Sequence, residues 1–270
     1  MSLVDTNWLE ENLDKVKIID CSWDLPSENR NFEEEFKNEH IPNAIFFDLD
    51  KNSKKHTDLP HMLPNKNVWN KIISNLGISK NDRIIIYDNS NLISSCRCWY
   101  TFIYFGHSPK LVSVLNGGFR KWKKEKKTTT NRINKFPKTN YLSTELNNLV
   151  KDKNKIDLNI SKKEFVVIDA RNQERFEGKV PDPRKNVRSG SIPNSVCLPF
   201  SQVINEDFCF KSSKHLEKIF QKILKNQENF PVFSCGSGVT ACVLALAYSL
   251  VKDNYLPVIY DGSWAEYGKI

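Results

Sequence analysis

The chain alternates short continuous apolar runs with longer segments whose apolar residues recur at helical spacing. Branched and aromatic residues follow one another in Arg83–Asp88 (RIIIYD) and Phe165–Asp169 (FVVID). Continuous apolar runs are typical of parallel strands that are buried on both faces. Helices are predicted over 32–37, 68–76, 98–105 and 240–251. The pattern therefore predicts an α/β fold, with mostly parallel sheets and helices on both faces.

The second half of the chain repeats the landmarks of the first half in the same order. Apolar runs that end at a polar residue, Ile-Pro-Asn turns and glycine-containing turns recur at separations of 145 to 151 residues, pairing Asp20 with Asp169, His40 with Ser191, Asp88 with Cys235, and Asn116 with Asp261. We therefore predict two tandem domains, at 1–125 and 151–270. A linker is expected at 126–150, since the chain around 123–141 is polar and has no core pattern.

The stretch 230–250 (FPVFSCGSGVTACVLALAYSL) predicts a strand, a tight loop and a helix, with Cys235 at the end of the strand. In parallel sheets, chemistry lies beyond the carboxyl ends of the strands. Gly236 and Gly238 permit backbone angles that let consecutive N–H groups surround an anion near a helix N-terminus. A thiol placed there is expected to lose its proton more readily and to act as a nucleophile. The alternative interpretation is a buried structural cysteine.

The first half does not repeat this loop. Asp88 stands at the position of Cys235 and is followed by Asn89, Ser90 and Asn91. The loop therefore has neither the nucleophile nor the glycines. We expect the first domain to be catalytically silent and the second to carry the chemistry.

Composition narrows the function class. The 270 residues have 39% hydrophobic content and a formal net charge of +8. The lysines are scattered among polar residues, and the cluster 120–127 has the character of a solvated connector, so nucleic-acid binding is not expected. The seven cysteines form no CxxC pair, so no metal site is predicted.

The sequence also suggests a compartment. The first residues (MSLVDTNWLEENLDKVK) lack the apolar core of a signal peptide and are too acidic for a transit peptide. No apolar run approaches the roughly 20 residues needed to cross a bilayer. With free thiols, the pattern predicts a protein of the reducing cytoplasm that does not bind membranes.

These features resemble the tandem-domain rhodanese family over essentially the whole chain. The resemblance rests on HIPNA at 40–44, SIPNS at 191–195, HMLP at 61–64, CGSGVT at 235–240 and DGSW at 261–264. The loop is similar to that of the family's 3-mercaptopyruvate sulfurtransferases, whereas thiosulfate-using members typically have basic residues after the cysteine. The resemblance implies that Cys235 takes sulfur from 3-mercaptopyruvate, releases pyruvate and holds a persulfide. A small thiol, a thioredoxin-like protein or cyanide would then accept the sulfur, with no metal or organic cofactor, and a monomer is expected.

The resemblance also assigns residues that bind the substrate. Arg175 and Arg184, in RFEGKVPDPR, match the family's two carboxylate-binding arginines. The planar guanidinium fork suits a carboxylate. Arg171 and Arg188 are weaker candidates. The loop residues expected to hold the anionic sulfur are Gly236, Gly238, Val239 and Thr240, and Thr240 is also expected to cap the following helix.

A proton relay is implied by three further matches. Ser237 in the loop, His61 in HMLP and Asp50 in FFDLD correspond to the family's serine, histidine and aspartate. Such a chain is chemically sensible, because protons must be managed around the thiol and the leaving enolate. The simpler readings are a turn serine, a loop histidine and a capping aspartate.

Three other functions compete with this prediction. A thiosulfate sulfurtransferase is disfavoured because Gly236 and Ser237 offer no cationic side chain. A cysteine phosphatase needs an arginine six positions after its cysteine, where this chain has Ala241. A non-catalytic binding module suits the first half, but the Cys235 loop argues against it for the whole chain.

Overall fold

The computed structural model describes residues 2–224, 230–252 and 255–270. By its internal contacts the chain divides into two compact units. The first contains residues up to 55, 63–146 and 206–209, and the second contains 56–62, 147–205 and 210–270. The short segments 56–62 and 206–209 thus each belong to the unit formed mainly by the other half of the sequence. The two units are described separately below.

The first unit is built on a five-stranded sheet in the order β1-β5-β4-β2-β3. Every neighbouring pair in it is parallel. The strands are β1 (Leu3–Val4), β2 (Lys17–Asp20), β3 (Ala44–Phe46), β4 (Ile84–Tyr87) and β5 (Val112–Leu115). The predicted run at 83–88 therefore forms β4, and the apolar run that the repeat places before Asp20 forms β2.

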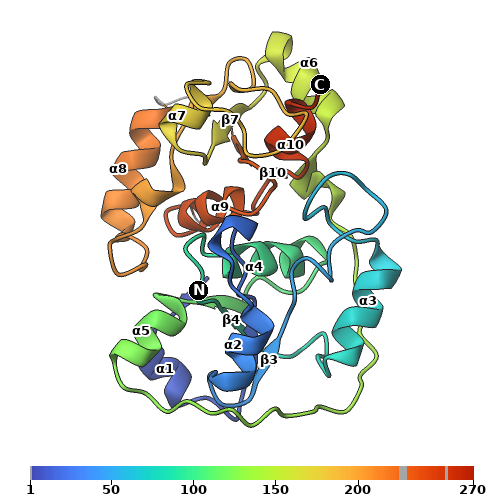
Figure 1. The fold of residues 1–270 in the computed structure, drawn as a ribbon, viewed down its shortest axis with the longest axis vertical. Helices are drawn as coiled ribbons and strands as arrows, with labels where there is room; N and C mark the ends of the chain where they lie inside the picture. Colours follow the sequence, from blue (N-terminus) through green and yellow to red (C-terminus); the bar gives the residue numbers. More distant parts are fainter. Residues whose placement is uncertain (1, 225–229, 253–254) are drawn as a thin grey trace. The chain divides into compact units, whose positions relative to one another are not determined.

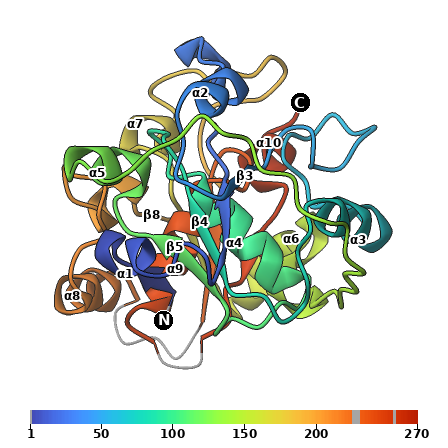
Figure 2. The ribbon, with the colours of Figure 1, turned by 90° about the horizontal axis from the view of Figure 1, so that it is seen from below.

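Helices cover both faces of this sheet. On one face, Ile85 and Tyr87 of β4 pack in a cluster with residues of α1 (Thr6–Glu10), α2 (Phe32–Asn38) and α5 (Gly118–Lys124). The alternate residues Ile84 and Ile86 point to the opposite face and are also fully buried. There α4 (Ser95–Tyr104) packs on β4 and β5, as Figure 2 shows, and α3 (Lys66–Asn75) stacks Trp69 against the ring of Phe105.

The second unit repeats this topology. Its parallel sheet has the order β6-β10-β9-β7-β8, which equals the order of the first sheet when strands are numbered within each unit. The strands are β6 (Val150–Lys151), β7 (Val166–Asp169), β8 (Val196–Cys197), β9 (Pro231–Ser234) and β10 (Ile259–Tyr260). The predicted α/β class and the tandem repeat are confirmed.

The second sheet is also covered on both faces (Figure 1). Residues of β7, β9 and β10 form one cluster with α6 (Lys153–Lys162) and α10 (Ser263–Tyr267). On the other face α9 (Ala241–Ser249) packs against β9 and against α8 (Ser213–Leu224), where Phe220, Phe233 and Tyr248 meet edge to face. The short helix α7 (Gln173–Phe176) follows β7.

Element boundaries agree with the pattern within a few residues. The helix predicted at 98–105 begins earlier, at Ser95, and the one predicted at 240–251 spans Ala241–Ser249. Asn43 and Asn194, in the two Ile-Pro-Asn turns, both adopt a left-handed backbone, with φ of 66° and 62°, which asparagine tolerates better than most residues. No described helix is long and apolar enough to span a membrane.

Candidate active site

Cys235 lies directly after β9, which is flanked by β7 and β10 in the second sheet. The residue is only 1% exposed. The loop 235–240 leads from this strand into α9. The predicted succession of strand, loop and helix, with the thiol at the carboxyl edge of the sheet, is confirmed.

The start of the loop is held by the segment that follows β10. The Cys235 N–H donates to Ser263 Oγ at 3.1 Å, and that hydroxyl donates to the Tyr260 carbonyl at 2.8 Å. The Trp264 and Ala265 N–H groups donate to the carbonyl oxygens of Cys235 (3.0 Å) and Gly236 (2.9 Å). The anchoring role of Ser263 was not predicted, although the motif DGSW contains it.

The amides of Gly236, Ser237, Val239 and Thr240 are available to an anion. Among the residues that the structure describes, no hydrogen bond is found from the backbone N–H groups of Gly236, Ser237, Val239 or Thr240. Gly238 has φ of +77°, a conformation that favours glycine. Unpaired N–H groups beside the N-terminus of α9 favour negative charge, as in other anion-binding loops.

Thr240 stands at the N-cap position of α9, as predicted, but its side chain does not cap the helix. Its hydroxyl makes no capping hydrogen bond, and its backbone is already helical, with φ of −72° and ψ of −17°. A side chain caps well from an extended N-cap residue, where its oxygen can reach the N–H groups of the first turn. Thr240 therefore marks the start of α9 without a side-chain cap.

Gly236 has a different role from the one its sequence pattern suggested. Its backbone lies outside the left-handed region that Gly238 occupies. A Cβ at this position would lie 3.1 Å from Arg184 Nη2 and 3.6 Å from Arg175 Nη2. Glycine at 236 thus gives room to two guanidinium groups, immediately beside Cys235.

Arg175 and Arg184 are joined by one carboxylate. Asp182 accepts from Arg175 Nη2 at 2.7 Å, and from the backbone N–H and Nη1 of Arg184 at 3.0 and 3.2 Å. Burial alone would raise the pKa of Asp182, but these hydrogen bonds and the two positive charges outweigh it and lower the pKa. The structure therefore brings together both predicted arginines, and Asp182 is a residue of this site that the sequence reasoning missed.

The two weaker arginine candidates are engaged elsewhere. Arg171 forms a buried ion pair with Asp169, with Nη2 to Oδ2 at 2.7 Å, and also donates to the Gly190 carbonyl. Arg188 stacks over Trp264, with its guanidinium carbon 5.2 Å from the ring centroid. Both side chains support the framework around DGSW.

His61 and Ser237 lie together in the second unit. His61 Nδ1 is 3.0 Å from Ser237 Oγ, and both side chains are buried. His61 adopts a left-handed backbone with φ of 58°. Asp50 belongs to the first unit, where its Oδ2 accepts from Trp23 Nε1 at 3.0 Å. Its participation in a relay with His61 stays a prediction.

Other thiols of the second half differ from Cys235. Cys242 is fully buried on α9 and donates to the Gly238 carbonyl, with a sulfur–oxygen distance of 3.2 Å, as expected of a core residue. Burial raises the pKa of Cys197 to about 12 and that of Cys209 to about 11. These thiols are therefore poor nucleophiles near neutral pH.

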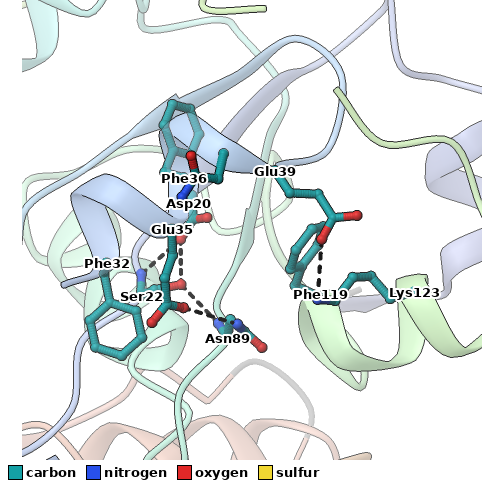
Figure 3. A pocket seen from close by; sticks show the side chains of 10 residues that line it. Asp20, Ser22, Phe32, Glu35, Phe36, Glu39, Asn89, Phe119 and Lys123 are labelled. Atoms are coloured by element: carbon teal, nitrogen blue, oxygen red, sulfur yellow. Dashed lines mark hydrogen bonds and ion pairs between the residues drawn. The ribbon is translucent and has the colours of Figure 1, made fainter. Parts of the chain in front are cut away.

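The corresponding edge of the first sheet carries carboxylates in place of a thiol. Asp88 accepts hydrogen bonds from the N–H groups of Ser90 and Ser95, so it closes its own turn. A cavity of about 200 Å³ lies at this edge (Figure 3), where the Ser22 hydroxyl donates to Asp20 and accepts from the Asn89 N–H. Among the described residues of the first unit, these polar groups satisfy one another, and Asp88 stands at the position that Cys235 holds in the second unit.

Comparisons with known proteins agree with this architecture. The rhodanese-like domain model matches residues 5–125 and 152–269. The mitochondrial thiosulfate/3-mercaptopyruvate sulfurtransferase 1 of Arabidopsis thaliana is 35% identical, covering 98% of this chain and 75% of its own length. The mouse 3-mercaptopyruvate sulfurtransferase is 34% identical, covering 98% of this chain and 91% of its own. The crystal structure of SseA from Escherichia coli, described as a 3-mercaptopyruvate sulfotransferase, superposes with a TM-score of 0.87 at 31% identity, covering 98% and 99%. The two matched domains, and a coverage of at least 75% of each of these relatives, show that this chain belongs to the rhodanese family, as a tandem-domain member.

Proposed function

We propose that this protein is a sulfurtransferase that takes sulfur from 3-mercaptopyruvate onto Cys235 and passes it to an acceptor. One observation carries the proposal: the guanidinium groups of Arg175 and Arg184 lie against Gly236, the residue next to the thiol. The site thus pairs a sulfur nucleophile with two partners for a carboxylate and a ketone. The names of the Arabidopsis and mouse relatives support the same activity.

The reaction follows from this arrangement. The Cys235 thiolate attacks the sulfur of 3-mercaptopyruvate, so an S–S bond forms and the C–S bond breaks. The electron pair of that bond leaves on carbon as the enolate of pyruvate, which takes up a proton. The free amides of Gly236, Ser237 and Thr240 stabilise the anionic persulfide. A thiolate or cyanide then attacks the outer sulfur and returns the Cys235 thiolate.

His61 and Ser237 supply the proton chemistry in this proposal. Their side chains are within hydrogen-bond distance of each other beside the loop. A serine hydroxyl held by an imidazole can relay the proton that the thiol loses and the enolate gains. Asp50 is proposed as the carboxylate that orients His61.

Thiosulfate is the second candidate donor. The name of the Arabidopsis relative includes it, and two arginines can also bind a sulfonate-like group. The loop itself, however, adds no positive charge, because Gly236 and Ser237 follow the cysteine. We therefore propose 3-mercaptopyruvate as the preferred donor.

One assay tests this proposal directly. Pyruvate release from 3-mercaptopyruvate with a small thiol acceptor is compared with thiocyanate formation from thiosulfate and cyanide, using the same enzyme preparation. We expect kcat/KM to be clearly higher for 3-mercaptopyruvate. A preference for thiosulfate would favour the second candidate, and no sulfur transfer from either donor would refute the proposal.

The acceptor, location and assembly are further parts of the proposal. A small thiol or a thioredoxin-like protein is the proposed acceptor, and the chain is proposed to act as a cytoplasmic monomer. Because Cys235 is nearly fully buried, a small acceptor should react faster than a bulky one. Sulfur-transfer rates to both acceptors, light scattering and cell fractionation test these points.

A further inference from the structure

We propose that Asp182 determines donor specificity, because it sets the net charge of the substrate site to match a singly charged donor. The inference rests on the proposed function and extends it to the choice between donors. It concerns a residue that touches the two arginines, and it acts on the substrate through them.

The geometry makes Asp182 the shared partner of both cations. Its side chain is 1% exposed, whereas those of Arg175 and Arg184 are 22% and 25% exposed. Oδ2 accepts from Arg175 and Oδ1 from Arg184. The carboxylate therefore lies buried behind two guanidinium groups that remain partly accessible beside Gly236.

Arg175 and Arg184 each keep N–H donors that Asp182 does not use, so they can bind a further anion. A guanidinium carries five N–H donors. Asp182 takes one from the side chain of Arg175 and one from that of Arg184. The Nε of Arg175 is buried and has no hydrogen-bond partner among the described residues. Buried donors without a partner are uncommon in proteins, so this N–H can take a further acceptor.

Within the group formed by Arg175, Arg184 and Asp182, the charges sum to a single positive unit. Two guanidinium groups and one carboxylate give +1, and the adjoining Gly236 and Ser237 add nothing. The nearby Arg171 is neutralised by its own partner, Asp169. A donor with one carboxylate and a protonated thiol balances this charge, whereas thiosulfate brings two negative charges. Complementary charge therefore favours the singly charged donor at these arginines.

The decisive variant removes the charge and keeps the shape. Asp182→Asn retains an acceptor oxygen for the Arg184 N–H but raises the site charge to +2. We expect the ratio of kcat/KM for 3-mercaptopyruvate to that for thiosulfate to fall by about tenfold or more. The KM for thiosulfate should also become more sensitive to salt, since exposed charge is screened by ions.

Two matched variants separate charge from packing. Asp182→Glu keeps the charge and should keep the donor ratio, even if both rates fall. Asp157→Asn removes an exposed carboxylate that pairs with Lys153, and it should leave the ratio unchanged. If Asp182 had a purely structural role, Asp182→Asn would lower kcat/KM equally for both donors. That result would overturn the inference.

A measurement on the unaltered protein covers the case in which Asp182→Asn does not fold. Monocarboxylates and dicarboxylates of similar size are compared as competitive inhibitors of sulfur transfer. Tighter inhibition by the monocarboxylates is expected, and tighter inhibition by the dicarboxylates would overturn the inference. If the unaltered protein releases no pyruvate from 3-mercaptopyruvate, the proposed function itself fails, which is a different result from an unchanged donor ratio.

Discussion

Ser237 Oγ lies 3.0 Å from His61 Nδ1, although 176 positions separate the two residues in the sequence. The contact exists because segment 56–62 belongs by its contacts to the second unit, together with the Cys235 loop. His61 has a left-handed backbone, which is uncommon for residues other than glycine but is more frequent for histidine than for most residues. A segment from the first half of the sequence thus supplies a side chain to the candidate active site.

This pair predicts the effect of removing the Ser237 hydroxyl. Ser237→Ala should lower kcat for pyruvate release by about 100-fold, the order of a lost general acid–base group. The protein should stay folded, since the change deletes one oxygen from a loop. Ser195→Ala, which removes a hydroxyl bonded to the Ile192 carbonyl, is the control and should retain activity. An unchanged kcat in Ser237→Ala would show that the Ser237 hydroxyl takes no part in a proton relay.

Substitutions of Cys235, at the start of the loop, and of Cys242, in α9, should have opposite outcomes. Cys235→Ser should abolish turnover, because no other group can hold the transferred sulfur. Cys242→Ser should retain much of it, since that thiol packs in the core of α9. Mass spectrometry after incubation with donor alone should find one added sulfur atom in the unaltered protein and in Cys242→Ser. Added sulfur in Cys235→Ser would contradict the assignment of the nucleophile.

The two loop glycines predict different kinds of damage. Gly236→Ala places a Cβ 3.1 Å from Arg184 Nη2, so the arginine must move. We expect KM for 3-mercaptopyruvate to rise about tenfold, equivalent to about 1.4 kcal/mol. The free energy of unfolding should change little. Gly238→Ala instead forces alanine to a φ of +77° and should cost stability of about 1–2 kcal/mol. Urea unfolding and donor kinetics on both variants test this contrast, which fails if Gly236→Ala binds donor normally.

Asp20 predicts a pH dependence of stability in the first unit. Burial chiefly, together with the charge of Asp88, raises its pKa to about 7, although the hydrogen bonds from Ser22 and Tyr87 oppose the rise. In the unfolded chain the pKa is about 3.9. The folded state therefore holds the proton more tightly, and this contribution to stability is complete below about pH 4 and is lost as pH rises through 7. At about 1.4 kcal/mol per pKa unit, the loss is on the order of a few kcal/mol.

Replacing Asp20 by asparagine should flatten this dependence. Asp20→Asn keeps an acceptor oxygen for the Ser22 N–H, which Asp20 Oδ1 accepts at 2.9 Å, and removes the buried charge. The variant should be more stable than the unaltered protein at pH 8 and similar or less stable at pH 4, as measured by urea unfolding. Asp58→Asn, at an exposed position, is the control. Equal pH profiles for Asp20→Asn and the unaltered protein would show that the carboxyl stays charged at low cost.

Local pattern was sufficient for much of the fold. The continuous apolar runs at 83–88 and 165–169 became β4 and β7, because a strand buried on both faces needs apolar side chains on both. Short or polar elements could not be predicted from the local pattern. The strands Leu3–Val4 and Val150–Lys151 have two residues each, too few to show any period. The helix Lys153–Lys162 carries too many charges and amides for a clear apolar face.

The sequence by itself determined the repeat, the cysteine-containing loop at 235–240 and the arginines that match the family motif, because each of these is a set of residue types in a fixed order. Tertiary structure alone decided that Asp182 joins Arg175 to Arg184, that Ser263 holds the Cys235 N–H, and that His61 meets Ser237. It also decided why residue 236 is glycine, since the reason is a guanidinium from a distant segment and not a backbone angle. Each of these depends on contacts between residues far apart in the chain, whose geometry local propensity and spacing do not encode.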